Sequence, residues 1–197
     1  IAHTHSQIIA MPIIPANVEA EVTNSLSYFQ RKGRCVFCSL IDEAISYEAT
    51  LYDPHSGKIR RKINVGQYIV EQSKHFVAIK PFASRFEWEV HILPLVHQSD
   101  YTSMDDDVCS DLGMIVKKVM ARLDQVLGGV QYNYFLHSAP RDARAGDLRE
   151  SFHWHLEICP RTSIPNGFEL GSGLAVNTVS PEKAARQLRE VVIEGSE

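Results

Sequence analysis

The sequence predicts an α+β fold, in which an antiparallel sheet carries flanking helices on one side. Strand-like runs outnumber helical patterns along the 197 residues, and the short connections between them favour antiparallel pairing. A stretch near the end, residues 152–158, organises the rest. Side chains alternate across a strand, so His153, His155 and Glu157 share one face and apolar side chains occupy the other. Two imidazoles and a carboxylate on one strand face indicate a functional site.

The same pattern stands at the start of the chain, where His3, His5 and Gln7 alternate with small polar residues. The dipeptide at positions 14–15, Ile-Pro, also returns at positions 164–165 with the same offset. Internal self-similarity of this kind indicates two copies of one unit. Because the first copy begins only two residues after the start, we expect the chain to be the C-terminal part of a longer protein.

The first third of the chain predicts a strand, two helices and a hairpin. Residues 3–11 read as a strand that ends in a rigid Pro-Ile-Ile-Pro exit. Apolar residues at helical spacing predict a helix over 19–30, which Gly33 closes. A tight turn over 35–38 leads into a short apolar helix. The turn Asp-Pro-His-Ser-Gly within 52–63 predicts a hairpin or an exposed insertion.

The remainder predicts the main sheet and its helices. The longest element is a helix over 104–127 with a single apolar stripe. Ser103 is its expected cap, with Asp106 three residues on, and two glycines stop it. Ser180 and the proline after it open a last helix. The predicted strands are 67–71, 75–80, 88–93, 132–137 and the central strand, which follows a polar loop over 140–150.

Composition narrows the class of protein. The chain is 44% hydrophobic and 22% charged, as in ordinary globular proteins, and its net charge of −4 argues against a nucleic-acid partner. No apolar stretch approaches the roughly 20 residues of a membrane span. The lack of a signal-peptide pattern and the sparse cysteines predict a reducing, cytoplasmic setting.

The Cys-x2-Cys pair at Cys35 and Cys38 predicts a metal site. Structural zinc takes four ligands in a tetrahedron, and such a pair supplies two of them from one turn. His97 follows a strand and a proline, and His153 begins the central strand, so these two histidines complete a structural set. The alternative is that the cysteines are buried small hydrophobes. Further candidate ligands are His55, His75, His91, His137 and His155.

The repeated His-x-His pair predicts chemistry at phosphorus. A neutral imidazole is a competent nucleophile there when a neighbour fixes its tautomer and donors steady the phosphoryl oxygens. Gln7 can donate a hydrogen bond but cannot shuttle a proton, so it would hold a covalent intermediate without activating water. This favours group transfer over hydrolysis. In the second copy Glu157 stands in place of the glutamine, and its charge would repel phosphoryl oxygens, so His155 is not predicted to be a second nucleophile.

The motifs along almost the whole chain occur in a specific order. They run from residues 2–15 through Cys-Val-Phe-Cys, Phe-Glu-Trp-Glu-Val-His-Ile-Leu-Pro, His-Ser-Ala-Pro, His-Trp-His-Leu-Glu-Ile and Gly-Phe-Glu-Leu-Gly-Ser-Gly. This series resembles the galactose-1-phosphate uridylyltransferase family of the histidine-triad superfamily, and the cysteine pair is most like the branch that includes plant ADP-glucose phosphorylase. The resemblance implies a histidine-triad-like sheet, with the end of a first repeat in residues 1–33 and a second repeat in 34–197.

The resemblance also implies an activity, the movement of a nucleoside monophosphate between a nucleotide sugar and a sugar 1-phosphate or phosphate. His5 matches the nucleophile that becomes nucleotidylated, and Gln7 matches the glutamine that stabilises the intermediate. His3 matches a zinc ligand of the first half, whose other ligands would lie upstream. Phe168 and Glu169 match residues near the sugar, which often reach the partner subunit's site. The family usually works as a homodimer.

Two metal sets follow from the same resemblance. The branch that keeps the cysteines places zinc on residues matching Cys35, Cys38, His97 and His153. Other members place a metal, with iron as an alternative to zinc, on residues matching Glu21, His137, His153 and His155. Both sets include His153, so we expect them to exclude each other, and the soft cysteine set should win for zinc.

Two other functions stay open at this point. One is a histidine-triad nucleotide hydrolase, against which Gln7 argues, because hydrolases carry a third histidine there. The other is a zinc-stabilised, non-catalytic module for nucleotide binding or dimerisation. Since most of a first repeat would lie upstream, we expect the 197 residues alone to be poorly active. The sequence leaves open whether the base is uracil or adenine and which hexose is used.

Overall fold

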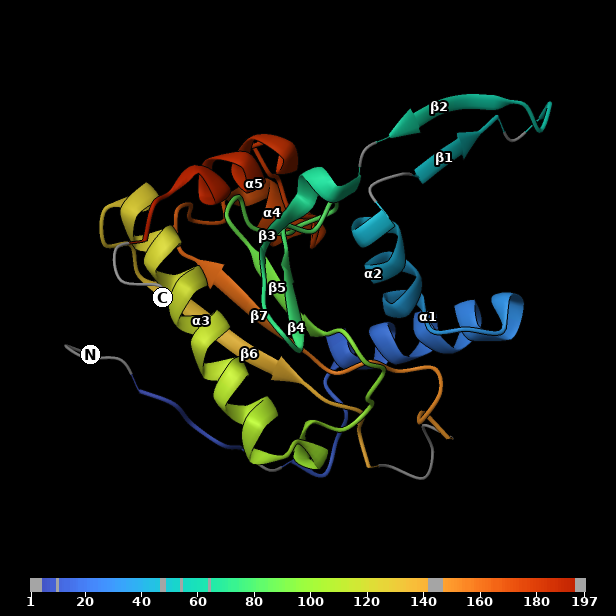
Figure 1. Ribbon diagram of the computed structural model, residues 1–197, viewed down its shortest axis with the longest axis horizontal. Helices are drawn as coiled ribbons and strands as arrows, with labels where there is room; N and C mark the ends of the chain where they lie inside the picture. Colours follow the sequence, from blue (N-terminus) through green and yellow to red (C-terminus); the bar gives the residue numbers. More distant parts are fainter. Residues whose placement is uncertain are drawn as a thin grey trace.

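A computed structural model describes residues 5–9, 11–46, 49–53, 55–63, 65–141 and 147–193. Its centre is a five-stranded antiparallel sheet in the order β3-β4-β5-β7-β6, flanked by helices, and a two-stranded ribbon, β1-β2, projects from it (Figure 1). The α+β prediction is confirmed. The helices are α1 (Ala16–Lys32), α2 (Val36–Ser46), α3 (Asp106–Leu127), α4 (Gly167–Ser172) and α5 (Pro181–Glu190), with short 3-10 turns at Val65–Tyr68 and Tyr101–Ser103. The strands are β1 (Ala49–Tyr52), β2 (Ile59–Ile63), β3 (Ile69–Gln72), β4 (Phe76–Ile79), β5 (Val90–Pro94), β6 (Tyr132–His137) and β7 (His155–Pro160).

One face of the sheet packs against α3 and α5. Trp154 and Ile92 are fully buried there, together with Ile115 and Val119 of α3 and Leu188 of α5. Full burial of such side chains stabilises the fold by about 1.5–3 kcal/mol each. The apolar stripe predicted along residues 104–127 is therefore the one that meets the sheet.

The opposite face is covered as well, so the expectation of helices on one side only is wrong. Ile41 and Ala44 of α2 pack against Val77, Ile79 and Leu93 of the sheet. All four residues of β4 are buried, which means that both of its faces need an apolar cover. Figure 1 shows α3 and α5 on one side of the sheet and α1 and α2 on the other.

The helix ends follow simple capping chemistry. Asp105, not Ser103, caps α3, and its carboxylate accepts a hydrogen bond of 2.9 Å from the backbone of Val108. Ser103 is unavailable because it lies in the preceding 3-10 turn. Gly128 ends α3 in the left-handed conformation, with φ 69°, and Ser180 caps α5 as predicted.

Residues 5–9 do not form the strand that the alternation over 3–11 predicts. A strand needs a neighbour to complete its backbone hydrogen bonds, and this segment has no such ladder among the described residues. Its contact with the sheet is a side-chain hydrogen bond between the hydroxyls of Ser6 and Tyr134, on the edge strand β6. Ile8 is 99% exposed.

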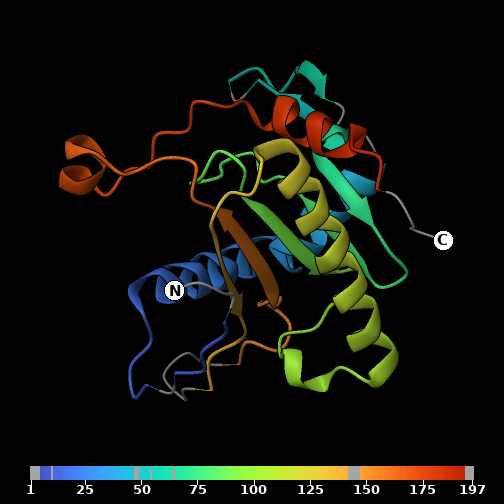
Figure 2. The same ribbon diagram turned by 90° about the vertical axis from the view of Figure 1, so that its left-hand side faces the viewer.

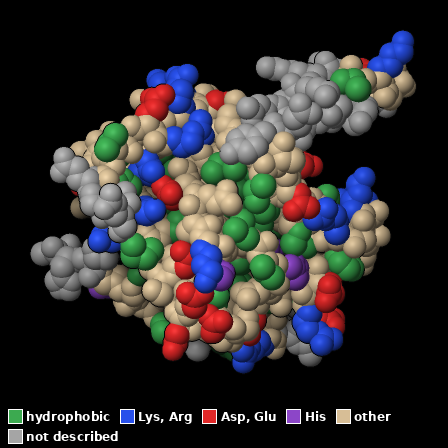
Figure 3. Space-filling model, in the orientation of Figure 1, with side chains coloured by type: hydrophobic (Ala, Val, Ile, Leu, Met, Phe, Trp, Pro, Cys, Tyr) green, Lys and Arg blue, Asp and Glu red, His purple; other side chains and the backbone are tan. Residues whose placement is uncertain are grey.

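The surface carries mixed charge. On the face seen in Figure 3, acidic and basic side chains of the described residues are interspersed between apolar ones. Within the part of the chain that the structure describes, no helix has the length and apolar character needed to cross a bilayer.

Candidate functional site

Four side chains from three parts of the chain meet at one end of the sheet, and together they form the sulfur cluster. Cys35 and Cys38 come from the start of α2, His97 follows β5, and His153 directly precedes β7. One ligand atom from each lies within 4.8 Å of the others. The Sγ atom of Cys38 is 3.2 Å from Nδ1 of His97 and 3.5 Å from Nδ1 of His153. The structure thus brings together the set that the Cys-x2-Cys spacing suggests.

Backbone carbonyls orient both imidazoles of the sulfur cluster. Nε2 of His97 lies 2.8 Å from the carbonyl oxygen of Arg149, and Nε2 of His153 lies 3.0 Å from that of Pro94. Each Nε2 can donate its proton to the carbonyl, which leaves the lone pair of Nδ1 directed at Cys38. Ligating histidines in metal sites are oriented in this way.

Protonation in the sulfur cluster is consistent with a site for a dication. Burial and the adjacent Cys35 sulfur raise the pKa of Cys38 to about 12, so this thiol keeps its proton unless a cation replaces it. Burial and the neighbouring His97 lower the pKa of His153 to about 4, which keeps the imidazole neutral. Two cysteine sulfurs and two imidazoles within reach of one point are a donor set of structural zinc. The residues present therefore fit zinc.

A second group, the carboxylate cluster, consists of Glu21, His137 and His155. Nδ1 of His137 is 2.8 Å from Oε2 of Glu21, and Nε2 of His155 is 3.4 Å from Oε1. That Oε1 atom is buried and has no hydrogen-bond partner among the described residues. An unsatisfied buried carboxylate oxygen is costly, and a cation between it and the imidazoles would satisfy it.

The expected competition for His153 does not arise in this geometry. His153 turns both ring nitrogens away from the carboxylate cluster, one toward Cys38 and one toward Pro94. The ligand atoms of Glu21, His137 and His155 lie within 4.8 Å of one another without it. The two clusters share no residue, and each could hold a cation on its own.

Sequence reasoning missed a buried charge network beside His155. Glu157 lies between Arg85, whose guanidinium donates to it, and the imidazoles of His91 and His155, each 3.5 Å away. Glu89 in turn lies 2.7 Å from Nε2 of His91. Both carboxylates are at most 5% exposed, so their charges depend on these partners.

Neighbouring charged and hydrogen-bonding groups outweigh burial in setting the pKa values of Glu157 and His155. Burial alone would raise the pKa of Glu157, but the hydrogen bond with His155 and the charges of His91 and Arg85 outweigh it and lower the pKa to about 2. Burial likewise works against the charged form of His155, yet Glu157 and Glu21 raise its pKa. A signal for the network was present in the sequence. Glu89 directly precedes β5 and is two positions from His91, as His155 is from Glu157 in β7, and the sheet register pairs His91 with Glu157.

The proposed reacting pair, His5 and Gln7, stands apart from both clusters. The two residues are exposed and irregular in backbone, and no hydrogen bond joins either side chain to another described residue. His3 lies outside the described residues. The structure therefore does not bring His5 and Gln7 into a formed pocket.

Phe168 and Glu169 lie on α4, which extends away from the body (Figure 2). Phe168 is 59% exposed. Glu169 has a local role, because its Oε2 accepts a hydrogen bond of 3.0 Å from the backbone of Asn166 and closes a capping box.

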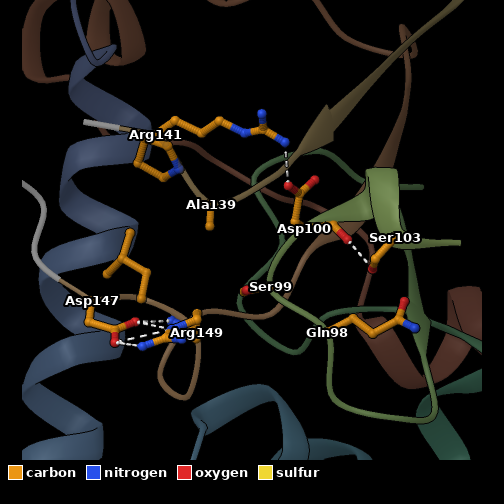
Figure 4. A pocket seen from close by; sticks show the side chains of 10 residues that line it. Gln98, Ser99, Asp100, Ser103, Ala139, Arg141, Asp147 and Arg149 are labelled. Carbon is orange, nitrogen blue, oxygen red and sulfur yellow. Dashed lines mark hydrogen bonds and ion pairs between the residues drawn. The ribbon is translucent and has the colours of Figure 1, made fainter. Parts of the chain in front are cut away.

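Figure 4 shows an open cleft of about 560 Å³. Arg141 pairs with Asp100 at 2.7 Å and Arg149 pairs with Asp147 at 2.6 Å, so neither arginine brings an unpaired charge. The cleft adjoins the cluster through the Arg149 carbonyl, which holds His97. Its lining comprises Gln98, Ser99, Asp100, Ser103, Ala139, Pro140, Arg141, Asp147, Leu148 and Arg149.

Two sequence relatives span nearly the whole chain. ADP-glucose phosphorylase of Arabidopsis thaliana is 31% identical over 191 residues, which make up 97% of this chain and 48% of the relative. Galactose-1-phosphate uridylyltransferase of Thermotoga maritima is 26% identical over 200 residues, or 98% of this chain and 56% of the relative. The chain thus spans about half the length of the curated relatives it matches. No protein-family model matches it.

Solved structures agree with these relatives. An ADP-glucose phosphorylase from Arabidopsis thaliana with bound ADP-glucose superposes with a TM-score of 0.75 at 29% identity, covering 93% of this chain and 52% of that one. A uridylyltransferase superposes with a TM-score of 0.73 at 26% identity, covering 91% and 51%. The resemblance inferred from the motifs is confirmed at the level of homology and fold.

Proposed function

Because the homologues of this chain are galactose-1-phosphate uridylyltransferases and an ADP-glucose phosphorylase, we propose that it is the C-terminal part of a nucleotidyltransferase. The enzyme moves a nucleoside monophosphate between a nucleotide sugar and a sugar 1-phosphate or phosphate. The observation that carries this proposal is the motif at residues 2–15 in a chain whose relatives bear these activities. Residues 1–33 then end a first repeat, and 34–197 form the second.

The reaction proceeds in two displacements at one phosphorus atom. In the first, a ring nitrogen of His5 attacks the α-phosphorus of the nucleotide sugar, a P–N bond forms, and the bond to the departing sugar 1-phosphate breaks. In the second, a phosphate oxygen of the acceptor attacks the same phosphorus, and the imidazole leaves. The exposure of His5 supports this role, because the ring must reach a phosphorus in line with its leaving group.

Gln7 steadies the intermediate. It is two positions from His5, so in an extended strand completed by upstream neighbours both side chains would share a face. Its amide then donates to a non-bridging phosphoryl oxygen. Because a side-chain amide is neither protonated nor deprotonated near neutral pH, it cannot act as a general base toward water, and the nucleotide passes to the acceptor.

Zinc occupies the sulfur cluster of Cys35, Cys38, His97 and His153 in this proposal. Bound there, it cross-links α2, the end of β5 and the start of β7, which is a structural role. His3 would serve a corresponding site completed upstream. The carboxylate cluster offers nitrogen and oxygen ligands, which suit iron or zinc. Zinc thiolates need reduced cysteines, which favours a cytoplasmic setting.

Phe168 and Glu169 contact the sugar, and the enzyme works as a homodimer. Both proposals are supported by the position of these residues on α4, which extends away from the body and leaves Phe168 exposed. A side chain presented in this way can reach a site on a second copy. Nucleotide sugar and sugar 1-phosphate are the expected small-molecule partners.

The proposal is tested by following the label of a nucleotide sugar labelled in its α-phosphate. The protein that includes the upstream residues is exposed to UDP-glucose or ADP-glucose without acceptor, and protein-bound label is measured before and after addition of a sugar 1-phosphate or phosphate. We expect label on the protein that then passes to the acceptor, and the donor that labels faster identifies the base. Label released to water as fast as it forms would indicate a hydrolase, and a protein that binds both donors without labelling would be a non-catalytic module.

A further inference from the structure

Residues 163–176 form an arm, which lies between β7 and α5 in the sequence and carries α4. The arm projects from the body of the protein (Figure 2). Its large apolar side chains are exposed, including Ile164 at 82% and Leu170 at 76%. Within the described residues, the hydrogen bonds of the arm are local, such as those of Asn166 with Glu169 and of Ser172 with Phe168. The direction of the arm must therefore be set where it leaves the body.

One carboxylate ties the two ends of the arm together. Oε2 of Glu87 accepts a hydrogen bond of 2.9 Å from the hydroxyl of Thr162, directly before the arm. Oε1 of the same carboxylate accepts a hydrogen bond from the hydroxyl of Thr178, which follows it. Because the two oxygens belong to one rigid group, the distance between the ends of the arm is fixed by Glu87.

A second contact anchors the returning end on the same loop. The amide of Asn177 donates to Oγ of Ser84 at 3.0 Å and to the carbonyl of Phe86 at 3.3 Å. The ammonium group of Lys80, which is fully buried, also donates to Ser84 and to the Phe86 carbonyl. A buried charge held by these groups resists displacement of the loop.

The loop that carries Glu87 is held from its other side as well. Oε2 of Glu89 accepts hydrogen bonds from the backbone amides of Arg85, at 2.7 Å, and Phe86, at 2.9 Å. Arg85 in turn donates to Glu157 on β7. The base of the arm is thus connected through a stiff loop to the central strand.

We propose that Glu87 is a positioning residue, which holds both ends of the arm and so sets the direction in which Phe168 and Glu169 are presented. This inference rests on the proposed function, in which those two residues contact the sugar. A misplaced contact of this kind weakens binding of the sugar substrate but leaves the reaction at His5 unchanged. Glu87 itself acts through the arm and makes no contact with the substrate.

The test compares three variants in the protein that includes the upstream residues. Glu87→Ala removes the bridge. Glu87→Gln keeps it, since an amide can accept from one threonine hydroxyl and donate to the other. Thr162→Val combined with Thr178→Val removes the donors with little change in shape. Glu190→Ala, an exposed glutamate at the end of α5, is the matched control.

Two readouts separate positioning from a general loss of structure. Hydrogen exchange of the amides in 163–176 should quicken in Glu87→Ala and in the double threonine variant, while exchange in β5 and β7 stays as in the parent. KM for the sugar 1-phosphate should rise about 10-fold or more in both, with kcat little changed. Glu87→Gln and Glu190→Ala should resemble the parent in both readouts.

Three results would overturn the inference. They are unchanged exchange of the arm in Glu87→Ala, faster exchange throughout the sheet, and a looser arm with an unaltered KM. Failure of the proposed function has a different signature, because the parent protein would then carry no label at His5. The labelling of the parent and the exchange of the arm are measured independently.

Discussion

The two copies of the His-x-His motif occupy opposite environments. His5 is exposed, lies outside any strand and has no hydrogen-bonded side-chain partner among the described residues. His155 is 1% exposed within β7, with the ring of Phe37 at 4.9 Å, the ring of His91 at 5.5 Å, and Glu157 beside it. The same residue pattern thus supplies an accessible imidazole at one end of the chain and a locked one at the other.

This difference shows that neighbours, more than the motif, decide what a histidine can do. β7 lies between β5 and β6, and this placement gives His155 partners on every side. A ring held by carboxylates and aromatic rings cannot approach a phosphorus in line with its leaving group. Under the proposed function, burial gives the second copy a role in structure and metal ligation and leaves the chemistry to the exposed first copy.

The largest expected effect is the contrast between two asparagine substitutions. In the protein that includes the upstream residues, His5→Asn should lower kcat by at least about 10⁴-fold, because asparagine cannot form the P–N bond. His155→Asn should retain measurable turnover and mainly reduce stability. Steady-state kinetics of both variants provide the measurement. Equal losses at the two positions would break the comparison.

Removal of a sulfur ligand tests the structural role of the second copy, since His153 belongs to the sulfur cluster. Cys35→Ser should lower the zinc content by one equivalent and the free energy of unfolding by about 5 kcal/mol, because the remaining ligands are left buried without their cation. Metal analysis of protein purified without added metal, followed by urea unfolding, measures both. The control is Cys109→Ser, an exposed cysteine of α3. Undiminished zinc in Cys35→Ser would show that the ligand set is wrong.

Two substitutions that place the residue of one copy in the other, Glu157→Gln and Gln7→Glu, test whether charge or burial separates the two copies. Glu157→Gln should lower the free energy of unfolding by about 3–5 kcal/mol, because Arg85 and His91 lose a buried charge partner, and it should leave His155 unreactive. Gln7→Glu should leave stability unchanged and suppress labelling of His5, since a carboxylate repels the phosphoryl oxygens. Labelling at His155 in the Glu157→Gln variant would show that charge, not burial, silences the second copy.

The smallest effect concerns Lys80, which lies under the same loop as Arg85. Burial lowers its pKa to about 8, below the ordinary value of 10.5. Between these two pH values the unfolded chain binds more protons than the folded one, so stability should rise with pH across this window by up to about 3 kcal/mol. The rise should vanish in Lys80→Met. Urea unfolding of both proteins at pH 7 to 10.5 measures it, and parallel curves would contradict the assignment.

Much of the fold could be predicted because it depends on local patterns. The apolar stripe of α3, the proline after Ser180, and the alternation in β6 and β7 each determine their element with few neighbours. The strand expected at residues 3–11 depends instead on a pairing partner, which residues 5–9 lack among the described residues. The apolar run Phe76–Ile79 signals a strand that is buried on both faces, but the sequence does not say that α2 provides the second cover, because that depends on long-range packing.

The candidate site likewise combines features set by local sequence with features set by long-range packing. Cys35 and Cys38 are one turn apart, so their proximity is visible in the sequence. The places of His97 and His153 at strand ends also favour the meeting of the four side chains. The network of Glu89, His91 and Glu157 depends on sheet register across strands that are far apart in sequence. The separation of the sulfur cluster from the carboxylate cluster depends on which way the His153 ring turns, and residue spacing alone cannot predict that.

The position of the label tests the central claim most directly. The protein that includes the upstream residues is exposed to a nucleotide sugar labelled in its α-phosphate, digested, and its peptides are analysed by mass spectrometry. The account predicts an acid-labile, base-stable nucleotidyl group on the peptide that contains His5 and none on the peptide that contains His155. A nucleotidyl group on His155, or turnover with no labelled histidine, would contradict it.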